Sequence, residues 1–532
     1  MSSGGDRVDS PRRSGDVGLR LATRKQANGY RYLMHRMGVA VSHWSVRLIH
    51  DPSRSRAASW KVGAVIAVLG IIGSFFMGWL KPQGKIGDGD KILAARESGA
   101  LYVKVDGVVH PVLNLASARL IAGNANDPKF VPGKEIRNLP QGAQVGIVGA
   151  PADMTVRRPL TAGWSICDRL GSTGAKIVPK TTVLIGQGEL GDWSSEVRAP
   201  DAVLMSYGGA VFVVTDGHRS QIDLADRAVT LALGLGGGDL KPAPMSRALY
   251  EALSPTAPLR VPDVETPGVP VAYAPAGLSL VSGSVIRTKD PAGRVQFFVA
   301  LPAGLQTIPA TLATALGNAG LSGTKVIDAD PAQVARLPLT KAFDTSVFPE
   351  DRLRLADKAA QAVTCVMWRK DAADPRARVT TVSGRRLPIP IGDELRVQPL
   401  VKDGPMVADE VYIAVDSANF VQVTGLEPDS RRNESLWWIT DSGVRWGVWT
   451  STGGASINPD GQLKDDNSND ERNTRKALGL EGQATPAPWS VVKWLPASAV
   501  PLSKAAALVA RDTYNNGKGT TLAPGPLGKA GQ

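Results

Sequence analysis

One uncharged stretch near the start of the 532-residue chain constrains its architecture most. Residues 62–80 read VGAVIAVLGIIGSFFMGWL, with a lysine on each side and Trp60 and Trp79 at the edges. A helix over this stretch is about 28 Å long, close to the hydrocarbon thickness of a bilayer. A cleaved signal peptide has a shorter apolar region nearer the N-terminus, whereas about 60 mostly polar residues come first here. The stretch therefore predicts a retained, single-pass transmembrane helix.

The distribution of charge gives this helix a direction. Residues 1–61 contain twelve Lys or Arg and four Asp, whereas residues 81–532 contain 49 basic and 45 acidic groups. Basic flanks remain in the cytoplasm. We therefore expect an N-terminus in the cytoplasm and a large C-terminal domain in the periplasm, outside the inner membrane. Because this domain is nearly neutral and has no nucleic-acid-binding motif, the net charge of +12 does not indicate a nucleic-acid partner.

Two cysteines, Cys167 and Cys365, both lie in the predicted periplasmic part. An even number of cysteines in an oxidising compartment predicts one disulfide, and two buried free thiols are the alternative. The pair cannot form a metal site with His110 and His218, the two histidines of this part, because their spacing does not resemble that of metal ligands. We expect no metal and no cofactor from these residues.

A strand, a glycine-containing turn, a second strand and a helix recur four times in the periplasmic part. Two of the turns are Asp-Gly pairs, at residues 106–107 and 216–217. Such pairs between apolar runs indicate tight hairpins, because both turn residues need a positive φ. Each unit then continues to a Leu-Pro pair or a near equivalent, which ends a second helix. The expected strand pairs lie within residues 101–113, 211–224, 296–308 and 436–448.

The positions of the cysteines indicate an internal duplication. Cys167 lies 27 residues after Pro140, and Cys365 lies 27 residues after Pro338. We expect two halves, residues 81–253 and 278–513, joined by a disulfide across a pseudo-twofold centre. The proline-rich residues 254–277 form a semi-rigid linker between the halves. A β-rich centre would be built from residues 181–185, 202–206, 379–382 and 410–415.

The predicted fold class is therefore α+β. It comprises an N-terminal amphipathic helix, one transmembrane helix and an elongated domain of four repeats around the β-rich centre. The alternative is a chance recurrence of hairpins in an ordinary α+β domain. Three polar or Gly/Pro-rich segments are predicted to be disordered, because they bury too little apolar surface to offset the entropy of ordering. They are residues 1–17, 453–473 and 514–532.

Residues 18–61 form a cytoplasmic arm that contains an amphipathic helix between residues 26 and 49. Apolar residues recur there at steps of three and four, on one face of the helix. A lone helix has no core, so this face needs a partner protein or an anionic membrane surface. Large aromatic anchors favour a partner protein. The expected docking residues are Tyr30, Leu33, Met37, Trp44 and Leu48.

Four sequence stretches together resemble the EccB family. They are GLRLATRKQANGYRYLMHRM at residues 18–37, ALYVKVDGVVHPVLNLASARLIAG at 100–123, SLWWITDSGVRWGV at 435–448 and LSKAAALVARDT at 502–513. EccB is the single-pass component of the mycobacterial type VII (ESX) secretion membrane complex. The stretches PMSRALYEAL and NFVQVTG most resemble the branch that serves the fifth ESX system.

The resemblance implies a structural subunit of a hexameric complex that exports proteins. It implies EccC, EccD and EccE as partners, and other copies of the chain beside it. EccB proteins are also described as ATPases, which is the alternative function and would make ATP a cofactor. The chain has no Gly-x4-Gly-Lys-Ser/Thr motif. The GxGxxG at residues 186–191 is not followed by an apolar helical pattern, so we expect a loop there. No catalytic residue is identified.

Overall fold

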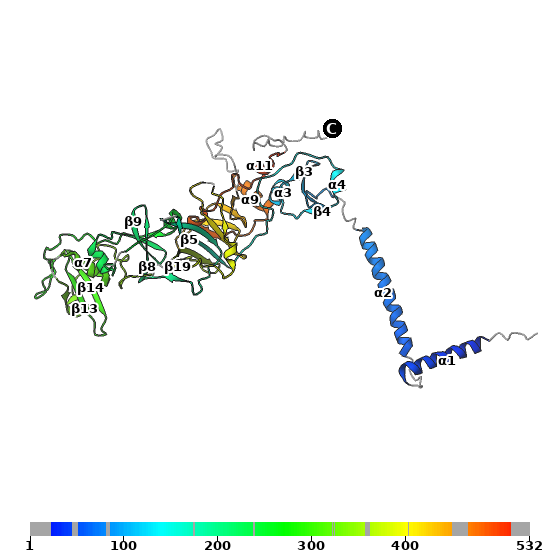
Figure 1. The fold of residues 1–532 in the computed structure, drawn as a ribbon, viewed down its shortest axis with the longest axis horizontal. Helices are drawn as coiled ribbons and strands as arrows, with labels where there is room; N and C mark the ends of the chain where they lie inside the picture. Colours follow the sequence, from blue (N-terminus) through cyan, green and yellow to red (C-terminus); the bar gives the residue numbers. More distant parts are fainter. Residues whose placement is uncertain are drawn as a thin grey trace, which may run out of the picture. The chain divides into compact units, whose positions relative to one another are not determined.

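The computed structural model describes residues 23–44, 52–80, 86–173, 176–237, 240–321, 323, 325–356, 362–402, 404–448 and 467–511. The chain divides into two compact units, residues 1–85 and 86–532. The described part of the first unit is helical, and that of the second contains mixed sheets and short helices (Figure 1). The predicted α+β class with one apolar N-terminal helix is therefore confirmed. The predicted disordered segments 1–17 and 514–532 lie outside the described residues.

The first unit contains two helices. Helix α1 (Arg24–His43) begins after Thr23, whose backbone N–H donates to Oε1 of Gln26 at 3.0 Å. The helix is shorter than predicted, because Trp44 takes a left-handed conformation with φ 50° and ends it. Helix α2 (Pro52–Leu80) covers the predicted transmembrane stretch and begins ten residues before it.

The second unit is built on a seven-stranded sheet with the order β20-β21-β6-β5-β18-β19-β7, the central sheet. Three of the four segments predicted for the β-rich centre are in it, as β6, β19 and β21. The prediction for residues 202–206 was wrong, because this strand pairs with the following hairpin in another sheet. The strands of the central sheet are β5 (Thr161–Thr173), β6 (Lys176–Ile185), β7 (Ser194–Val197), β18 (Val363–Asp371), β19 (Arg378–Gly384), β20 (Gln398–Pro399) and β21 (Glu410–Ile413).

Four smaller sheets define four modules with one common strand path. The orders are β3-β2-β1-β4 in module one, β10-β9-β8-β11 in module two, β15-β14-β13-β16 in module three and β24-β23-β22-β25 in module four. In each sheet the first strand of the module is antiparallel to the second and parallel to the fourth. In module two, β12 and β17 pair additionally with β10 and β8.

The bounds of these elements are as follows. Module one contains β1 (Ile92–Ala95), β2 (Leu101–Val105), β3 (Val108–Val112), α3 (Leu115–Ala122), β4 (Lys129–Val131) and α4 (Gly133–Arg137). Module two contains β8 (Asp201–Tyr207), β9 (Ala210–Thr215), β10 (His218–Ile222), α5 (Arg227–Ala232), β11 (Ala243–Pro244), α6 (Arg247–Ala252), β12 (Ser254–Pro255) and β17 (Arg354–Leu355). Module three contains β13 (Val285–Lys289), β14 (Val295–Leu301), β15 (Gly304–Ile308), α7 (Ala310–Ala319), β16 (Ile327–Asp328) and α8 (Pro331–Val334). Module four contains β22 (Phe420–Thr424), β23 (Leu436–Ile439), β24 (Arg445–Gly447), α9 (Asn467–Leu478), β25 (Thr485–Pro488) and α10 (Trp489–Val492), and α11 (Lys504–Ala507) follows it.

The two Asp-Gly turns form the hairpins that the sequence predicts. Asp106 and Gly107 have φ values of 48° and 84° between β2 and β3, and Asp216 and Gly217 have 47° and 76° between β9 and β10. Because a non-glycine residue with positive φ is uncommon, the Asp-Gly sequence fixes the site of each turn. The prediction missed the first strand of modules one, three and four and the fourth strand of all four modules, because it was built on the turn that joins the second and third strands.

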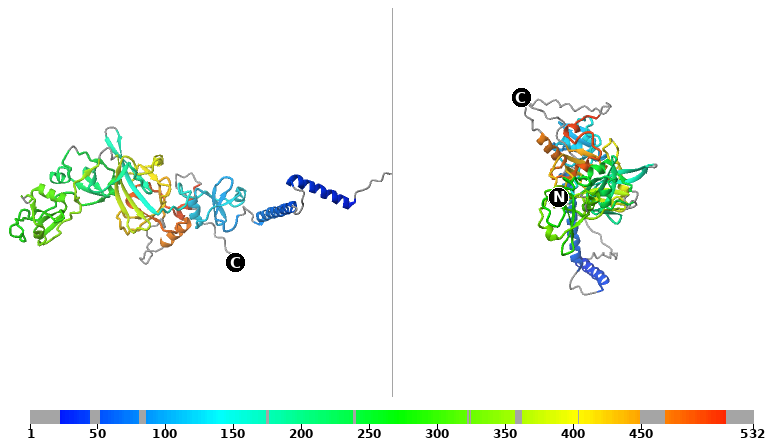
Figure 2. Two further views of the ribbon diagram at one scale, coloured as in Figure 1. Left: turned by 90° about the horizontal axis from the view of Figure 1, so that it is seen from below. Right: turned by 90° about the vertical axis from the view of Figure 1, so that its left-hand side faces the viewer.

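The modules share cores in pairs. Helix α9 and the sheet of module four pack on α3 and the sheet of module one, and Figures 1 and 2 show these segments side by side. Helices α5 and α7 similarly join modules two and three. One face of the central sheet packs against α6 and α10. The central sheet therefore contacts both pairs.

Two segments are more ordered than the sequence predicts. Residues 467–473, predicted to be disordered, form the start of α9, and the remaining residues 453–466 lie outside the described part. Docking on module one stabilises this polar helix, since Leu478 is fully buried there. Within the predicted linker 254–277, β12 pairs with β10 and both Leu259 and Val271 are buried. This segment is therefore packed rather than a free spacer.

Candidate interaction surfaces

The apolar residues of helix α1 are exposed to solvent. Tyr30, Leu33 and Met37 lie on one side of the helix, and more than half of each residue is accessible. Trp44, directly after the helix, is 97% exposed. Leu48 lies outside the described residues. Large aromatic and aliphatic side chains at such exposure are typical of a surface that a partner covers.

Helix α2 has the length and composition of a membrane span. Its apolar window, Ala58–Met77, has a mean hydropathy of 1.9, and none of it is buried within the structure. A water-soluble core helix of this composition would be covered by the rest of the chain. The exposed apolar surface of α2 therefore fits a lipid environment.

Cys167 and Cys365 form a disulfide in the centre of the second unit. The two residues are directly opposite each other on the antiparallel strands β5 and β18. Both are fully buried, in a cluster with Leu184, Val363 and Tyr412. The bond joins positions 198 residues apart, so it ties together segments that the sequence keeps far from each other.

Asp168, the neighbour of Cys167, is a buried carboxylate that joins the central sheet to module two. Its Oδ2 accepts the backbone N–H of Ser246 at 2.6 Å, and its Oδ1 accepts the hydroxyl of Thr181 at 3.1 Å. Burial raises the pKa of Asp168 to about 6, although these hydrogen bonds act in the opposite direction. The nearby carboxylate of Asp409 raises the pKa further.

We expect Asp168 to make the stability of the second unit depend on pH. Its pKa is higher in the folded state than the usual 3.8, so the folded state binds the proton more tightly. The free energy of unfolding should therefore fall as the pH rises from about 4 to about 6, by up to about 3 kcal/mol from this group. Asp168→Asn should remove most of this slope, as measured by urea unfolding at a series of pH values. An unchanged slope in the variant would show that other groups cause it.

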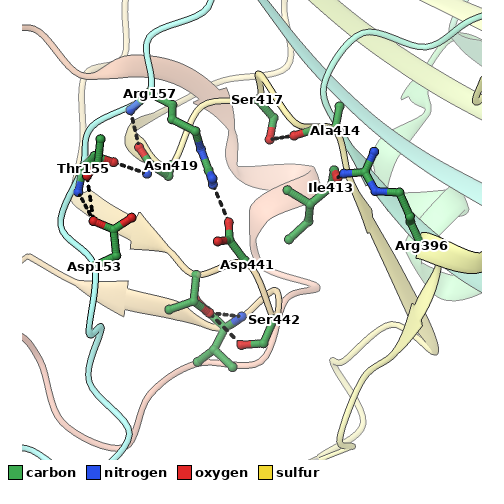
Figure 3. Close-up of polar contacts among 12 residues, drawn as sticks. Asp153, Thr155, Arg157, Arg396, Ile413, Ala414, Ser417, Asn419, Asp441 and Ser442 are labelled. Carbon is green, nitrogen blue, oxygen red and sulfur yellow. Dashed lines mark hydrogen bonds and ion pairs between the residues drawn. The ribbon is translucent and has the colours of Figure 1, made fainter. Parts of the chain in front are cut away.

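A polar clamp joins the end of module one to module four (Figure 3). The side chain of Asn419 accepts the backbone N–H of Arg157 at 2.9 Å and donates to the carbonyl oxygen of Thr155 at 2.8 Å. The guanidinium of Arg157 donates to Asp441 at 2.6 Å. Hydrogen bonds from Thr155 lower the pKa of Asp153 beside it. A cavity of about 270 Å³ lies at this junction, lined in part by Asp153, Arg157 and Asp441.

The two histidines of the second unit contact backbone carbonyl groups, and the glycine motif is a loop between two strands. His110 is buried with Nδ1 2.9 Å from the carbonyl oxygen of Ala143, and Nδ1 of His218 is 2.7 Å from that of Asp216. In the part of the chain that is described, no three His, Cys, Asp or Glu residues are grouped as metal ligands. The glycine motif, residues 186–191, lies between β6 and β7, so it leads into a strand and not into a phosphate-binding helix.

Sequence reasoning did not find the clamp. Arg157 and Asn419 are 262 residues apart, and no local pattern relates them. The one signal was Asp441, which begins a predicted turn but could equally serve only the turn. Contacts of this kind depend on how modules one and four dock.

Comparison with known proteins places these features in a family. Residues 19–516 match the family described as type VII secretion system ESX-1, transport TM domain B. The chain is 37% identical over 511 residues to the ESX-5 secretion system ATPase EccB5 of Mycobacterium marinum, covering 94% of this chain and 96% of that protein.

Three solved structures have the same fold. A chain of an intact ESX-5 inner membrane complex is 34% identical with a TM-score of 0.70, covering 96% of this chain and 99% of that one. A chain of the periplasmic assembly from the ESX-5 inner membrane complex is 36% identical with a TM-score of 0.68, covering 82% and 99%. The EccB3 dimer from the ESX-3 core complex is 31% identical with a TM-score of 0.66, covering 79% and 100%. The family match and these similarities, over nearly the full length, show that the chain belongs to the EccB family of type VII secretion proteins.

Proposed function

We propose that the chain is a structural subunit of a type VII (ESX) secretion membrane complex. It builds the periplasmic part of the complex and contributes to protein export across the mycobacterial inner membrane. The observation that carries this proposal is the match along 96% of the chain to a subunit of an intact ESX-5 inner membrane complex. Helix α2 supplies a candidate anchor, and the exposed face of α1 supplies a candidate contact.

The proposed orientation has residues 1–61 in the cytoplasm, residues 62–80 in the membrane and the rest in the periplasm. Residues 1–61 contain twelve basic groups and only four acidic groups, which supports a cytoplasmic position for them. A disulfide between Cys167 and Cys365 agrees with an oxidising compartment for the second unit.

The proposed partners are EccC, EccD and EccE homologues and other copies of the chain in a hexameric complex. Tyr30, Leu33, Met37, Trp44 and Leu48 form the proposed docking surface for a cytoplasmic partner. The exposure of Tyr30, Leu33, Met37 and Trp44 supports this role. The relative solved as a dimer supports association between copies.

We further propose that the four modules are internal repeats arranged around a pseudo-twofold centre. Their common strand order supports a repeat. The pairing of module one with four and of module two with three supports the twofold arrangement, with the disulfide near its centre. Repeated modules of this kind provide large surfaces for assembly.

ATP hydrolysis is the alternative function, and the name of the Mycobacterium marinum relative favours it. The chain has no phosphate-binding motif of the Gly-x4-Gly-Lys-Ser/Thr type. A periplasmic domain would also have no ATP available to it. Phosphate release by the purified full chain, at a rate above that of a mock preparation, would support the alternative.

Deletion of the chain tests the structural role. We expect that the remaining subunits of the secretion system no longer form the large membrane complex and that export stops. Full-length chain supplied in trans should restore both assembly and export. A complex that still assembles at normal size and abundance without this chain would contradict the proposal.

A further inference from the structure

A short 3-10 helix, η2 (Asp393–Arg396), and the residues just before it present two aliphatic side chains to solvent. Leu395 is 96% exposed and Ile391, four residues earlier, is 71% exposed. We call these two residues the knob. Side chains of this size at nearly full exposure are a recognised sign of a contact surface when they occur together.

The knob is held in a fixed position by polar contacts beneath it. The hydroxyl of Tyr412 donates to Oδ2 of Asp393 at 2.6 Å. Arg396 donates to Asp393 at 2.8 Å and to the carbonyl oxygen of Ile413 at 2.7 Å. Burial and the neighbouring Asp393 raise the pKa of Tyr412, so its hydroxyl remains a donor. These contacts fix η2 on β21, which limits the entropy that a partner must remove on binding.

A cavity of about 340 Å³ lies directly beside η2, and we call it the hole. Pro390, Asp393 and Arg396 form one wall. The remaining lining is mixed, with the polar residues Thr161, Gln187, Asp416 and Ser417 beside an apolar part. This apolar lining comes from Pro159, Trp164, Ala414, Val415 and Ala418. The hole is large enough for a leucine side chain, and Val415 at its mouth is 67% exposed.

The polar groups that line the wall of the hole already have partners. The carboxylate of Asp393 accepts from Tyr412 and Arg396, and the guanidinium of Arg396 is shared between Asp393 and the carbonyl oxygen of Ile413. An aliphatic guest would therefore cover this wall without leaving a buried charge unpaired. Thr161 and Ser417, which also line the hole, donate to Asp371 and to the carbonyl oxygen of Ala414. The two other polar lining residues, Gln187 and Asp416, are exposed to solvent. The apolar part of the hole therefore suits an aliphatic side chain.

We infer that the knob of one copy of this chain occupies the hole of a second copy, and the reverse. The knob and the hole share η2 and so lie on one surface. A twofold interface needs such a self-complementary surface, because each contact occurs twice. A different protein could bind the knob or the hole alone. A twofold contact between copies requires both features on the same surface. The inference rests on the proposed association between copies, which the dimeric relative supports.

Site-directed crosslinking of two tagged copies tests the inference. One full-length copy carries Leu395→Cys and one tag, and the other carries Val415→Cys and a second tag. Both are co-expressed, and isolated membranes are treated with a short bismaleimide. Cys167 and Cys365 are bonded to each other and fully buried, so they do not react. We expect a crosslinked product that carries both tags.

The matched control uses Leu339→Cys in place of Leu395→Cys. Leu339 follows module three and is also exposed, at 71%, but does not line the hole. We expect no doubly tagged product from it. A pull-down on each tag without crosslinker reports separately whether the copies associate at all.

The outcomes separate this inference from the proposed function. Copies that associate in the pull-down but give no product from the Leu395→Cys and Val415→Cys pair would overturn the inference and leave the proposed function intact. Copies that do not associate would overturn both. A product that joins the Leu395→Cys copy to a different protein through its introduced thiol would also overturn the inference, since another occupant then covers the knob.

A charge variant gives a second measurement. Leu395→Asp places two carboxylates in the contact, one on each copy, and should weaken the association of the copies by about 30-fold or more. Leu339→Asp should leave it unchanged. Retention of the disulfide and of protease resistance checks that each variant folds. Equal affinity for Leu395→Asp and the unmodified chain would contradict the inference.

Discussion

Replacing Cys167 and Cys365 by alanine should lower the free energy of unfolding of the second unit by about 5 kcal/mol. The disulfide closes a loop of 198 residues, so its loss gives the unfolded chain a large gain in conformational entropy. A domain is commonly stable by only about 5–15 kcal/mol, so this change is a large share of the total. Urea unfolding of the full chain in detergent, with intrinsic tryptophan fluorescence as the readout, measures the effect.

A control variant separates the covalent bond from packing. Val382 is buried in the same cluster and lies opposite Cys365 on the neighbouring strand. Val382→Ala removes comparable volume without touching the disulfide and should cost only about 2 kcal/mol. If the double cysteine variant loses no more stability than Val382→Ala, the bond does not stabilise the unit through its loop.

Replacing Tyr30, Leu33 and Trp44 together by alanine should release the chain from its cytoplasmic partner. Large side chains at the centre of an interface each contribute about 2 kcal/mol or more. The triple variant should therefore weaken the contact by well over 100-fold and remove the cytoplasmic partner from the affinity-purified material. The second unit should remain folded, because the three residues belong to the first unit.

Tyr32→Ala is the matched control for the triple variant. Tyr32 is as exposed as Tyr30, at 60% against 64%, but lies on the opposite side of α1. Tyr32→Ala should leave the co-purification of the partner unchanged, because only the face with Tyr30 and Leu33 contacts the partner. Retention of the cytoplasmic partner by the triple variant would refute docking through Tyr30, Leu33 and Trp44.

Local chemistry accounts for the parts of the fold that were predicted correctly. Asp106-Gly107 and Asp216-Gly217 determine their hairpins because few other residues tolerate a positive φ. Asn114 accepts the backbone N–H of Ser117 and so starts α3, the helix predicted after the first hairpin. The length and composition of residues 62–80 likewise identified a helix that is long and apolar enough to span a membrane, without tertiary information.

Tertiary contacts account for the parts that were missed. β4, β11 and β16 have only two or three residues each, and they are defined by pairing with the first strand of their module. The strand at residues 202–206 has an apolar pattern that suits any sheet, so the pattern could not choose between the central sheet and module two. α9 begins in a polar segment that is helical because its C-terminal end docks on module one.

The candidate surfaces likewise divide into one that local sequence predicts and one that depends on tertiary contacts. The spacing of Tyr30, Leu33 and Met37 predicted one apolar face on α1, since a helix places such residues on one side, and the structure leaves these residues exposed. The knob and the hole could not be found in this way. Trp164, Pro390 and Val415 come from three distant parts of the chain and meet only at the edge of the folded central sheet.

Affinity purification of the full chain from mild detergent tests whether the chain is a structural subunit of a secretion membrane complex. The eluate is run on a native gel, and the largest band is identified by mass spectrometry. We expect a band in the megadalton range that contains EccC, EccD and EccE homologues beside this chain. A chain that migrates alone or as a small homo-oligomer would contradict its role as a subunit of the membrane complex.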